Sequence, residues 1–251
     1  MPAPRPALVL AAALLLGARQ PAAPPAVWLV GDSTMAARAD SAPTLERGWG
    51  QMLARYLDPA VRVHNHAANG RSTRSFLAQG RWAAVRDSLR RGDYVLVEFG
   101  HNDEKVEDST RYTNPYTGFR RNLALMAAEA RARGATPVLL TPIARRHFNA
   151  QGTLEDTHGA YTLAVREVAR DARVPLVDLQ LLTEDLIAAA GPERSKALFV
   201  WVAPGASPFY PDGRQDDTHL NAEGARRVAR LAARGLREAG VPLGRYVTGA
   251  D

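Results

Sequence analysis

The sequence predicts an α/β fold in which helices cover both faces of a parallel β-sheet, a three-layer α/β/α sandwich. Five short apolar segments alternate with helical patterns, at 27–30, 61–65, 94–99, 138–140 and 174–179. Strands alternating with helices are typical of parallel sheets, because each crossover between parallel strands is long enough to hold a helix. The chain has 251 residues, 46% of them hydrophobic, and no cysteine. A core of this size needs no disulfide.

The first strand is predicted at 27–30, where the apolar run VWLV is followed by Gly-Asp-Ser. An uninterrupted apolar run indicates a strand buried on both faces. The segment 49–57 has helical spacing and ends before Pro59, and 61–65 alternates in polarity as an edge strand does. The segment 94–99, YVLVEF, is predicted to be a central strand.

Helices are predicted at 82–90, 119–133, 161–172, 181–190 and 222–239. Glycine follows several of them, and Gly191-Pro192 is expected to end the fourth. The remaining segments 102–117, 141–157 and 199–218 are predicted to be long loops at the carboxyl ends of strands. Long loops in this position usually carry function.

The first 26 residues are expected to be a signal peptide and a Pro/Ala-rich linker, with a single domain over 27–251. Arg5 precedes the apolar run 7–16, which is far shorter than the roughly 20 residues of a membrane span. We therefore expect a secreted or periplasmic protein with no membrane span in its mature form. The formal charge is +6, but the arginines are dispersed and no basic patch interleaved with aromatics is visible, so nucleic acid is not an expected partner.

Polar residues directly follow the first strand in the sequence Gly-Asp-Ser-Thr at 31–34. Ser33 would lie at the carboxyl end of a parallel strand, the edge of an open α/β sheet where ligands bind. A helix beginning just beyond would aim its free N–H groups at whatever Ser33 contacts. The alternative is that Asp32, Ser33 and Thr34 only cap that helix.

A second polar group, Asp216-Asp217-Thr218-His219, directly precedes the last predicted helix. Asp216 and His219 are three residues apart, so in a turn or first helical coil both side chains project to one side. A carboxylate that orients an imidazole needs this arrangement. Histidine, with an ordinary pKa of about 6.5, is suited to act as general base for a serine hydroxyl. The alternative is that both residues only cap the helix.

Two further segments follow strands. The segment 99–103, FGHND, ends the central strand, where the Asn102 amide can donate toward Ser33. The segment 65–72, NHAANGRS, follows the second strand, and Gly70 lets the backbone approach a ligand closely. The N–H groups of Ser33 and Gly70 and the Asn102 amide would then surround one oxyanion. Together these segments predict an acyl-transfer site.

The chain resembles the SGNH (GDSL-type) hydrolases in four blocks that occur in the family's order. The blocks are GDST with Ser33, N-x-A-x-x-G-R-S with Gly70, GHND with Asn102, and D-x-x-H with His219. The resemblance implies a flavodoxin-like fold with sheet order 2-1-3-4-5. It also implies Ser33 as nucleophile, His219 as base, Asp216 as its orienting acid, and no cofactor.

Within this family, the details resemble the rhamnogalacturonan acetylesterases. The matching stretches are GDSTMA at 31–36, GRS at 70–72, GHND at 100–103, RRHF at 145–148, and YPDG at 210–213 leading into DDTHLN. The resemblance implies removal of acetyl groups from pectin or related plant polysaccharide, so the expected partner is an acetylated polysaccharide or oligosaccharide. We expect the protein to act as a monomer.

Several arginines in the predicted loops could hold galacturonate carboxylates, for which the guanidinium fork is suited. They are Arg71, Arg74, Arg145, Arg146 and Arg214. Tyr210, with Trp201 and Phe209, could offer a wall on which a sugar ring stacks. The alternatives are solvated surface arginines and aromatic residues that pack the loops.

Other functions remain open at this point. Gly31-Asp32 and His101-Asn102-Asp103 vaguely resemble the strand ends of metallophosphoesterases, although the order GHND differs from theirs. No metal site is predicted, since His64 and His66 are too few as ligands. An acetylxylan esterase or another short-chain acyl esterase of the same family is the alternative, and a secreted carbohydrate-binding module is the non-enzyme alternative. The α/β-hydrolase elbow G-x-S-x-G does not occur in the sequence.

Overall fold

A central sheet of five parallel strands organises the fold. The computed structural model describes residues 24–39, 41 and 44–250, so the expected signal peptide lies outside the described residues. The strands are β1 (Ala26–Gly31), β2 (Arg62–Asn65), β3 (Tyr94–Glu98), β4 (Thr136–Leu140) and β5 (Leu176–Val177). Their order, β2-β1-β3-β4-β5, confirms the order that the family resemblance implies.

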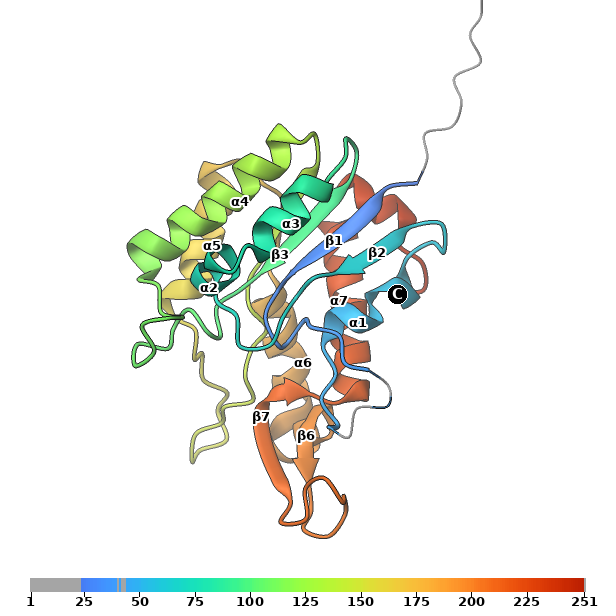
Figure 1. Cartoon of the computed structure of the whole chain (residues 1–251). Helices are drawn as coiled ribbons and strands as arrows, with labels where there is room; N and C mark the ends of the chain where they lie inside the picture. The colour runs from blue at the N-terminus through green and yellow to red at the C-terminus, as the bar shows by residue number, and fades with distance from the viewer. Residues whose placement is uncertain (1–23, 40, 42–43, 251) are drawn as a thin grey trace, which may run out of the picture.

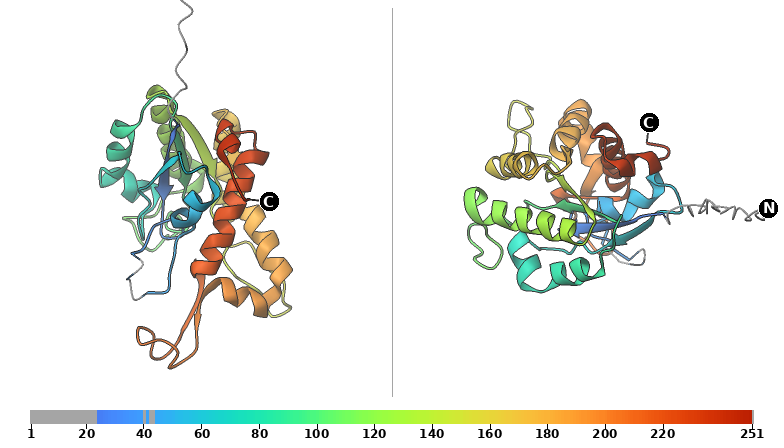
Figure 2. Two further views of the ribbon diagram at one scale, coloured as in Figure 1. Left: turned by 90° about the vertical axis from the view of Figure 1, so that its right-hand side faces the viewer. Right: turned by 90° about the horizontal axis from the view of Figure 1, so that it is seen from above.

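Two layers of helices enclose this sheet (Figures 1 and 2). The α-helices are α1 (Trp49–Met52), α2 (Thr73–Ala78), α3 (Arg81–Ser88), α4 (Arg120–Ala132), α5 (Ala160–Asp171), α6 (Leu179–Arg194) and α7 (Ala222–Glu238). Shorter helical turns are η1 (Leu53–Tyr56), η2 (Pro115–Phe119), η3 (Ser195–Leu198) and η4 (Pro242–Tyr246). The predicted three-layer α/β/α class is confirmed.

The central strand β3 shows why the sheet needs helices on both faces. All five of its residues are buried, and neighbouring side chains point to opposite faces. Val95 and Val97 belong to the apolar cluster that includes Phe119 of η2, whereas Leu96 belongs to the cluster that includes Val228 of α7. Burying each such side chain contributes about 1.5–3 kcal/mol to folding.

The predicted helices and strands differ from the structure at several boundaries. The strand predicted at 174–179 is reduced to β5, and the helix predicted at 49–57 becomes α1 followed by η1. The first helical segment of α6 ends at Gly191-Pro192 as predicted: Gly191 has the non-helical angles φ 73° and ψ 175°, and a second helical segment, not predicted, begins after this kink. Proline is tolerated there because the first turn of a helix needs no N–H from it. Helix α2 was not predicted.

The largest difference lies in the segment predicted as a loop at 199–218. It contains an antiparallel hairpin of β6 (Phe199–Val202) and β7 (Arg214–Leu220). In Figure 1 the hairpin projects from the lower end of the molecule, below the carboxyl ends of the central strands. Residues 216–219, predicted to form a turn or helix start, therefore belong to a strand.

Glycine allows the end of η3, just before the hairpin, to approach α7 closely. A Cβ atom on Gly224, in the first turn of α7, would lie 1.9 Å from the carbonyl oxygen of Leu198. Asn221 caps the same helix, since its side-chain oxygen accepts a hydrogen bond from the Gly224 N–H. The helix start, and the end of β7 before it, are thereby held against the body of the protein.

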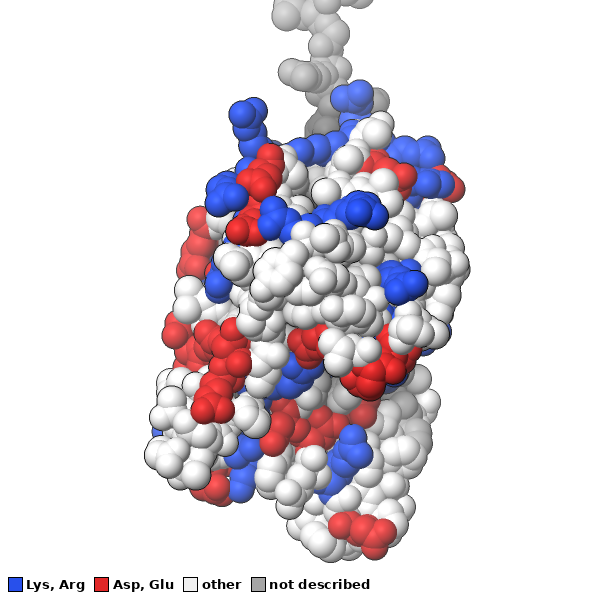
Figure 3. All heavy atoms as spheres, turned by 90° about the vertical axis from the view of Figure 1, so that its left-hand side faces the viewer, with Lys and Arg blue, Asp and Glu red and all other residues white. Residues whose placement is uncertain are grey.

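Basic and acidic side chains are interspersed on the face of the molecule shown in Figure 3. Many form ion pairs at the surface, such as Arg120 with Glu167 and Arg133 with Asp87. Exposed pairs of this kind contribute little to stability. Among the described residues, no helix is long and apolar enough to span a membrane.

Candidate active site

Ser33 lies in a tight turn that follows β1. The Thr34 N–H and hydroxyl donate to Asp32 Oδ1 at 3.0 and 2.9 Å, and the Ala36 N–H donates to the Asp32 carbonyl at 3.0 Å. These bonds close the turn. The expected helix just beyond Ser33 is absent from the described residues here, where the next helix, α1, begins at Trp49. The prediction of a helix dipole at Ser33, and the alternative that Asp32 to Thr34 cap a helix, are both wrong.

Ser33, His219 and Asp216 form one line of hydrogen bonds. His219 Nε2 lies 3.0 Å from Ser33 Oγ, and His219 Nδ1 lies 2.9 Å from Asp216 Oδ2. The sequence separation between the serine and the histidine is 186 residues. The structure thus brings together the predicted nucleophile, base and orienting acid in the geometry of a serine hydrolase triad.

An irregularity in the β6–β7 hairpin places Asp216 and His219 on one side. Phe199 pairs with Leu220, but the next residue, Val200, pairs with Asp216, so 217–219 bulge out of the ladder. The N–H groups of Thr218 and His219 both turn back to Asp216 Oδ1, at 2.9 and 2.8 Å. In a regular strand, residues three apart would point to opposite faces. The bulge replaces the helical turn that the spacing had predicted.

Electrostatics suit this line of residues to general base catalysis. Burial opposes ionisation of Asp216, but hydrogen bonds from His219 and Arg214 outweigh it and hold the pKa of that carboxyl well below its usual range. Burial also lowers the pKa of His219, but the hydrogen bond and charge of Asp216, aided by Glu46 and Asp32, raise it above its ordinary value of 6.5. The ionised carboxylate favours the tautomer with a proton on Nδ1, which leaves Nε2 free to accept the serine proton.

The predicted oxyanion donors come from two loops that pack together. The Asn102 amide donates to the Arg71 carbonyl at 3.2 Å, and Asn102 Oδ1 accepts from Arg111 Nη1 at 3.2 Å. Gly70, next to Arg71, has φ +72°, a left-handed conformation that favours glycine. The Ala68 N–H donates to the Gly31 carbonyl at 3.0 Å, which ties this loop to the end of β1. Asn102 and Gly70 therefore lie at the strand end that carries Ser33.

Buried acids beneath the site were missed by the sequence reasoning. Glu98 ends β3 and contacts the Thr34 hydroxyl at 3.1 Å, the Trp49 Nε1–H at 3.0 Å and the Ile143 N–H at 3.2 Å. Burial, with a contribution from the nearby Asp32, raises the pKa of Glu98 to about 8. An acidic residue inside the apolar segment YVLVEF was the available signal.

Asp103 has a similar supporting role. Its carboxylate accepts the N–H and hydroxyl of Thr73 and the hydroxyl of Thr113, the latter at 2.6 Å. Burial outweighs these hydrogen bonds and raises its pKa to about 7. Asp103 joins the Asn102 turn to the start of α2, and so supports the two loops that hold the predicted oxyanion donors.

His101 is buried between the same elements. Its Nδ1 lies 3.5 Å from Asp32 Oδ2, and its ring meets that of His158 edge to face, with 4.5 Å between centroids. Burial lowers the pKa of His101 to about 4, so the ring is neutral near pH 7. His158, given no role from sequence, lies 3.0 Å from Glu104 through Nδ1 and 2.9 Å from the Ile143 carbonyl through Nε2.

Two of the arginines predicted to bind substrate carboxylates pair with groups of the protein itself. The Arg146 guanidinium is buried and donates to Asp217 at 2.7 Å, to Ser195 at 3.1 Å and to the Pro192 carbonyl. Arg145 forms an ion pair with Glu104. Both guanidinium groups thus stabilise the loops through partners within the protein, and their role in substrate binding stays a prediction.

Arg71 and Tyr210 stay predictions as substrate residues. Arg71 donates through Nε to Gln79 at 3.0 Å, on the exposed surface beside Gly70. The Tyr210 hydroxyl lies 3.0 Å from the Thr44 hydroxyl, which ties the hairpin to the loop before α1.

One further acid faces the triad. Within the described chain, one group of acidic and histidine side chains lies close enough together to hold a metal ion, with ligand atoms within 4.8 Å of one another: Glu46, Asp216 and His219. Asp216 and His219 are bonded to each other, and Glu46 forms an ion pair with Arg38 at 3.0 Å. Hydrogen bonds thus account for the whole group. His64 and His66 instead pack against the Trp28 ring.

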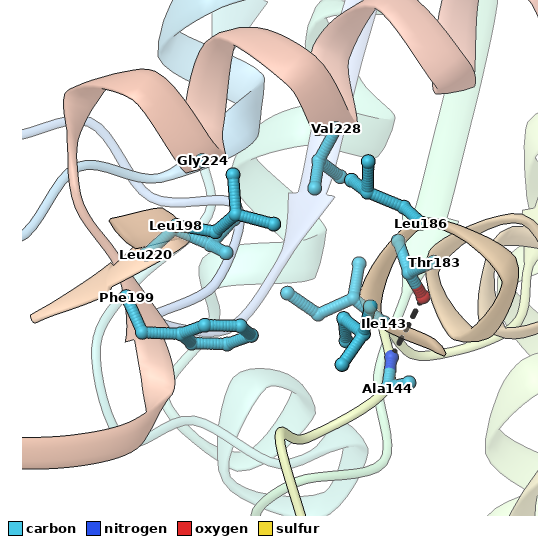
Figure 4. Close-up of a pocket in the computed structure, with 10 residues that line it drawn as sticks. Ile143, Ala144, Thr183, Leu186, Leu198, Phe199, Leu220, Gly224 and Val228 are labelled. Carbon is cyan, nitrogen blue, oxygen red and sulfur yellow. Dashed lines mark hydrogen bonds between the residues drawn. The ribbon is translucent and has the colours of Figure 1, made fainter. Parts of the chain in front are cut away.

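A small apolar cavity nearby is not a substrate pocket. Its walls come from α6, α7, the β6–β7 hairpin and the chain after β4, as Figure 4 shows. Its volume is about 10 Å³, and at its wall the Thr183 hydroxyl oxygen accepts a hydrogen bond from the Ala144 N–H at 2.9 Å. Such a volume holds about one water molecule. The cavity is a packing gap behind the hairpin.

A flavodoxin-like sheet with a serine, histidine and aspartate at its carboxyl edge defines a serine hydrolase of the SGNH type. The GDSL-like lipase/acylhydrolase family model matches residues 29–227. The chain belongs to this family and is a carboxylic ester hydrolase.

Curated relatives agree over most of the chain. It is 44% identical over 218 residues to rhamnogalacturonan acetylesterase RhgT of Bacillus subtilis, covering 86% of this chain and 91% of that protein. It is 31% identical over 247 residues to rhamnogalacturonan acetylesterase of Emericella nidulans, covering 90% of each. The solved structure of Bacillus subtilis protein YxiM is 27% identical, with a TM-score of 0.74. That match covers 87% of this chain and 58% of the other.

Proposed function

We propose that this protein is a serine carbohydrate esterase that removes acetyl groups from plant cell-wall polysaccharide, with rhamnogalacturonan as substrate. The observation that carries the proposal is the hydrogen-bonded line Ser33–His219–Asp216 beside the Asn102 amide. The likeness to the two rhamnogalacturonan acetylesterases supports the choice of substrate.

The geometry supports a two-step mechanism. His219 Nε2 takes the proton of Ser33 Oγ as the oxygen attacks the acetyl carbon, and the donors of Ser33, Gly70 and Asn102 stabilise the tetrahedral oxyanion. The bond from the acetyl carbon to the sugar oxygen then breaks, and His219 gives that proton to the departing oxygen, which becomes a hydroxyl and leaves an acetyl-enzyme. Water, deprotonated by His219, hydrolyses this ester and returns Ser33 to its free form.

The test is acetate release from acetylated rhamnogalacturonan and from acetylated xylan, measured side by side with Ser33→Ala as the blank. We expect release from the pectic polymer, and a loss of roughly 10⁶-fold in kcat for the variant. Release mainly from xylan would keep the esterase and refute the pectic substrate. Loss of activity in a strong chelator, with retention in the Ser33→Ala variant, would favour the metallophosphoesterase alternative.

We also propose that the protein is exported to the periplasm or the medium and acts there as a monomer. The apolar run at 7–16 after Arg5 supports export. Fractionation of expressing cells, followed by N-terminal sequencing and light scattering of the released protein, tests both statements. Retention of an intact N-terminus in the cytoplasm would refute export, and a dimer mass would refute the monomer.

A further inference from the structure

Arg214 extends the catalytic line of hydrogen bonds by one residue. It begins β7, two residues before Asp216, and its Nη2 donates to Asp216 Oδ2 at 2.8 Å. The same carboxylate oxygen lies 2.9 Å from His219 Nδ1. Arg214, Asp216, His219 and Ser33 are therefore joined by consecutive hydrogen bonds, with the arginine at the end away from the nucleophile.

The arginine is far more accessible than the acid that it contacts. The Arg214 side chain is 47% exposed, whereas that of Asp216 is 7% exposed. Within the described residues, Asp216 is the single carboxylate bonded to this guanidinium, and one nitrogen makes that contact. The other N–H groups of this guanidinium can donate to a second carboxylate from solution. Arg145 and Arg146, in contrast, are less exposed and already pair with carboxylates of the protein.

The charge of Arg214 opposes the protonation of His219. The groups that face this imidazole are Asp216, Glu46 and Asp32, all acidic, and two of them carry a cation: Arg214 on Asp216 and Arg38 on Glu46. During attack by Ser33, His219 becomes an imidazolium. A cation bonded to its orienting acid makes that change less favourable, and an anion that neutralises the cation makes it more favourable.

We propose that Arg214 is a carboxylate-recognising positioning residue that couples the binding of an acidic sugar to the basicity of His219. A uronate carboxylate on the free edge of Arg214 would help to bind the substrate and would cancel the opposing charge. In an acetylated polyuronate, carboxylate and ester occur on the same or neighbouring sugars, so one substrate can engage Arg214 and Ser33 together. The proposal rests on the proposed deacetylation of a uronate-containing polysaccharide.

The experiment compares a neutral ester, p-nitrophenyl acetate, with acetylated rhamnogalacturonan oligosaccharides, and measures kcat and KM against pH. The variants are Arg214→Gln and Arg214→Lys. Arg227→Gln is the matched control, because Arg227 is 46% exposed and also pairs with a carboxylate, that of Glu223 on helix α7, which has no hydrogen bond to the triad among the described residues. The control variant should behave as the unmodified protein with both substrates.

With the neutral ester, Arg214→Gln should move the acid limb of kcat/KM to higher pH by about half a unit to one unit, since the exposed charge is partly screened. With the acidic oligosaccharides, the same variant should lose about 10-fold more in kcat/KM than with the neutral ester. Arg214→Lys keeps the charge without the fork, so it should restore the acid limb but not the full preference for the acidic substrate.

Equal losses on both substrates with an unmoved acid limb would overturn the proposal and leave Arg214 as a contact that only holds the hairpin. An acid limb that moves to lower pH in Arg214→Gln would overturn it as well. Failure of the proposed function is distinguishable: the unmodified protein would then release no acetate from the oligosaccharides. The acid limb with p-nitrophenyl acetate would still report whether Arg214 acts on His219.

Discussion

Replacing Asp216 with asparagine tests whether its carboxylate sets the tautomer of His219. Each of the two carboxylate oxygens of Asp216 accepts two hydrogen bonds. Oδ1 accepts the N–H groups of Thr218 and His219, and Oδ2 accepts Arg214 Nη2 and His219 Nδ1. Asparagine offers one oxygen and one NH₂ group in the same space. The backbone N–H groups of 218 and 219 are fixed by the bulge, so the asparagine oxygen should remain with them.

The NH₂ group of Asp216→Asn would then face Arg214 and His219 Nδ1. To accept from it, His219 must carry its proton on Nε2, and Nε2 can no longer take the proton of Ser33 at 3.0 Å. An equivalent change in a serine protease triad lowers kcat by about 10⁴-fold, or about 5.5 kcal/mol of transition-state stabilisation. We expect a loss of this size in kcat on p-nitrophenyl acetate, with a small change in KM.

The neighbouring Asp217 provides a matched control. It accepts hydrogen bonds from Arg146 at 2.7 Å and from Trp201 Nε1 at 2.8 Å, and it belongs to the same bulge. Asp217→Asn changes one carboxylate to an amide without touching the triad, and should keep kcat within a few-fold. Thermal unfolding of both variants separates lost chemistry from lost folding. Activity of Asp216→Asn within 10-fold of the unmodified protein would refute the role assigned to the carboxylate.

Three other predictions follow from the same site. Asn102→Ala should lower kcat by about 10²–10³-fold, near 3–4 kcal/mol, with little change in KM, and full activity would mean that the amide is not an oxyanion donor. Because the pKa of His219 is raised and the base must be neutral, kcat/KM should rise with pH and reach half its plateau above pH 6.5; an acid limb below that value would contradict the assignment. The pKa of Glu98 is raised from 4.5 to about 8, so the folded protein holds a proton that the unfolded chain releases, and the free energy of unfolding should fall between those pH values. Urea titrations at several pH values should show that the free energy of unfolding of Glu98→Gln falls less steeply with pH. An equally steep fall in this variant would show that Glu98 is ionised in the folded protein.

The fold class was predictable because the sheet is buried on both faces. Segments such as VWLV and YVLVEF have no polar alternation, and glycine marks where β1 and β3 end. The predicted edge strand at 61–65 corresponds to β2, at the edge of the sheet. Strand β5 and the hairpin were poorly predicted because their pairing depends on residues far apart in the sequence, which local patterns do not register.

The placement of the candidate catalytic residues was predictable for a different reason. Parallel strands end at the same edge of a sheet, so Ser33 after β1 and Asn102 after β3 were expected at one edge once both strands were assigned. The ion pairs of Arg145 and Arg146 were not predicted, because residue type and loop position do not reveal whether a partner is present. Glu104 and Asp217, which engage these arginines, could not be assigned to them from the sequence.

The sequence by itself determined which residue types are available for acyl transfer, and the strand ends that carry Ser33, Gly70 and Asn102. The spacing of apolar residues and the glycines at the ends of strands are local properties, so they can be recognised without knowledge of any contact. The tertiary structure alone decided how Asp216 reaches His219, through a bulge in an unpredicted hairpin, and which arginine remains accessible beside them. These features depend on the register between β6 and β7 and on the desolvation of charged groups. Both are set by packing between distant segments, so no stretch of sequence contains them.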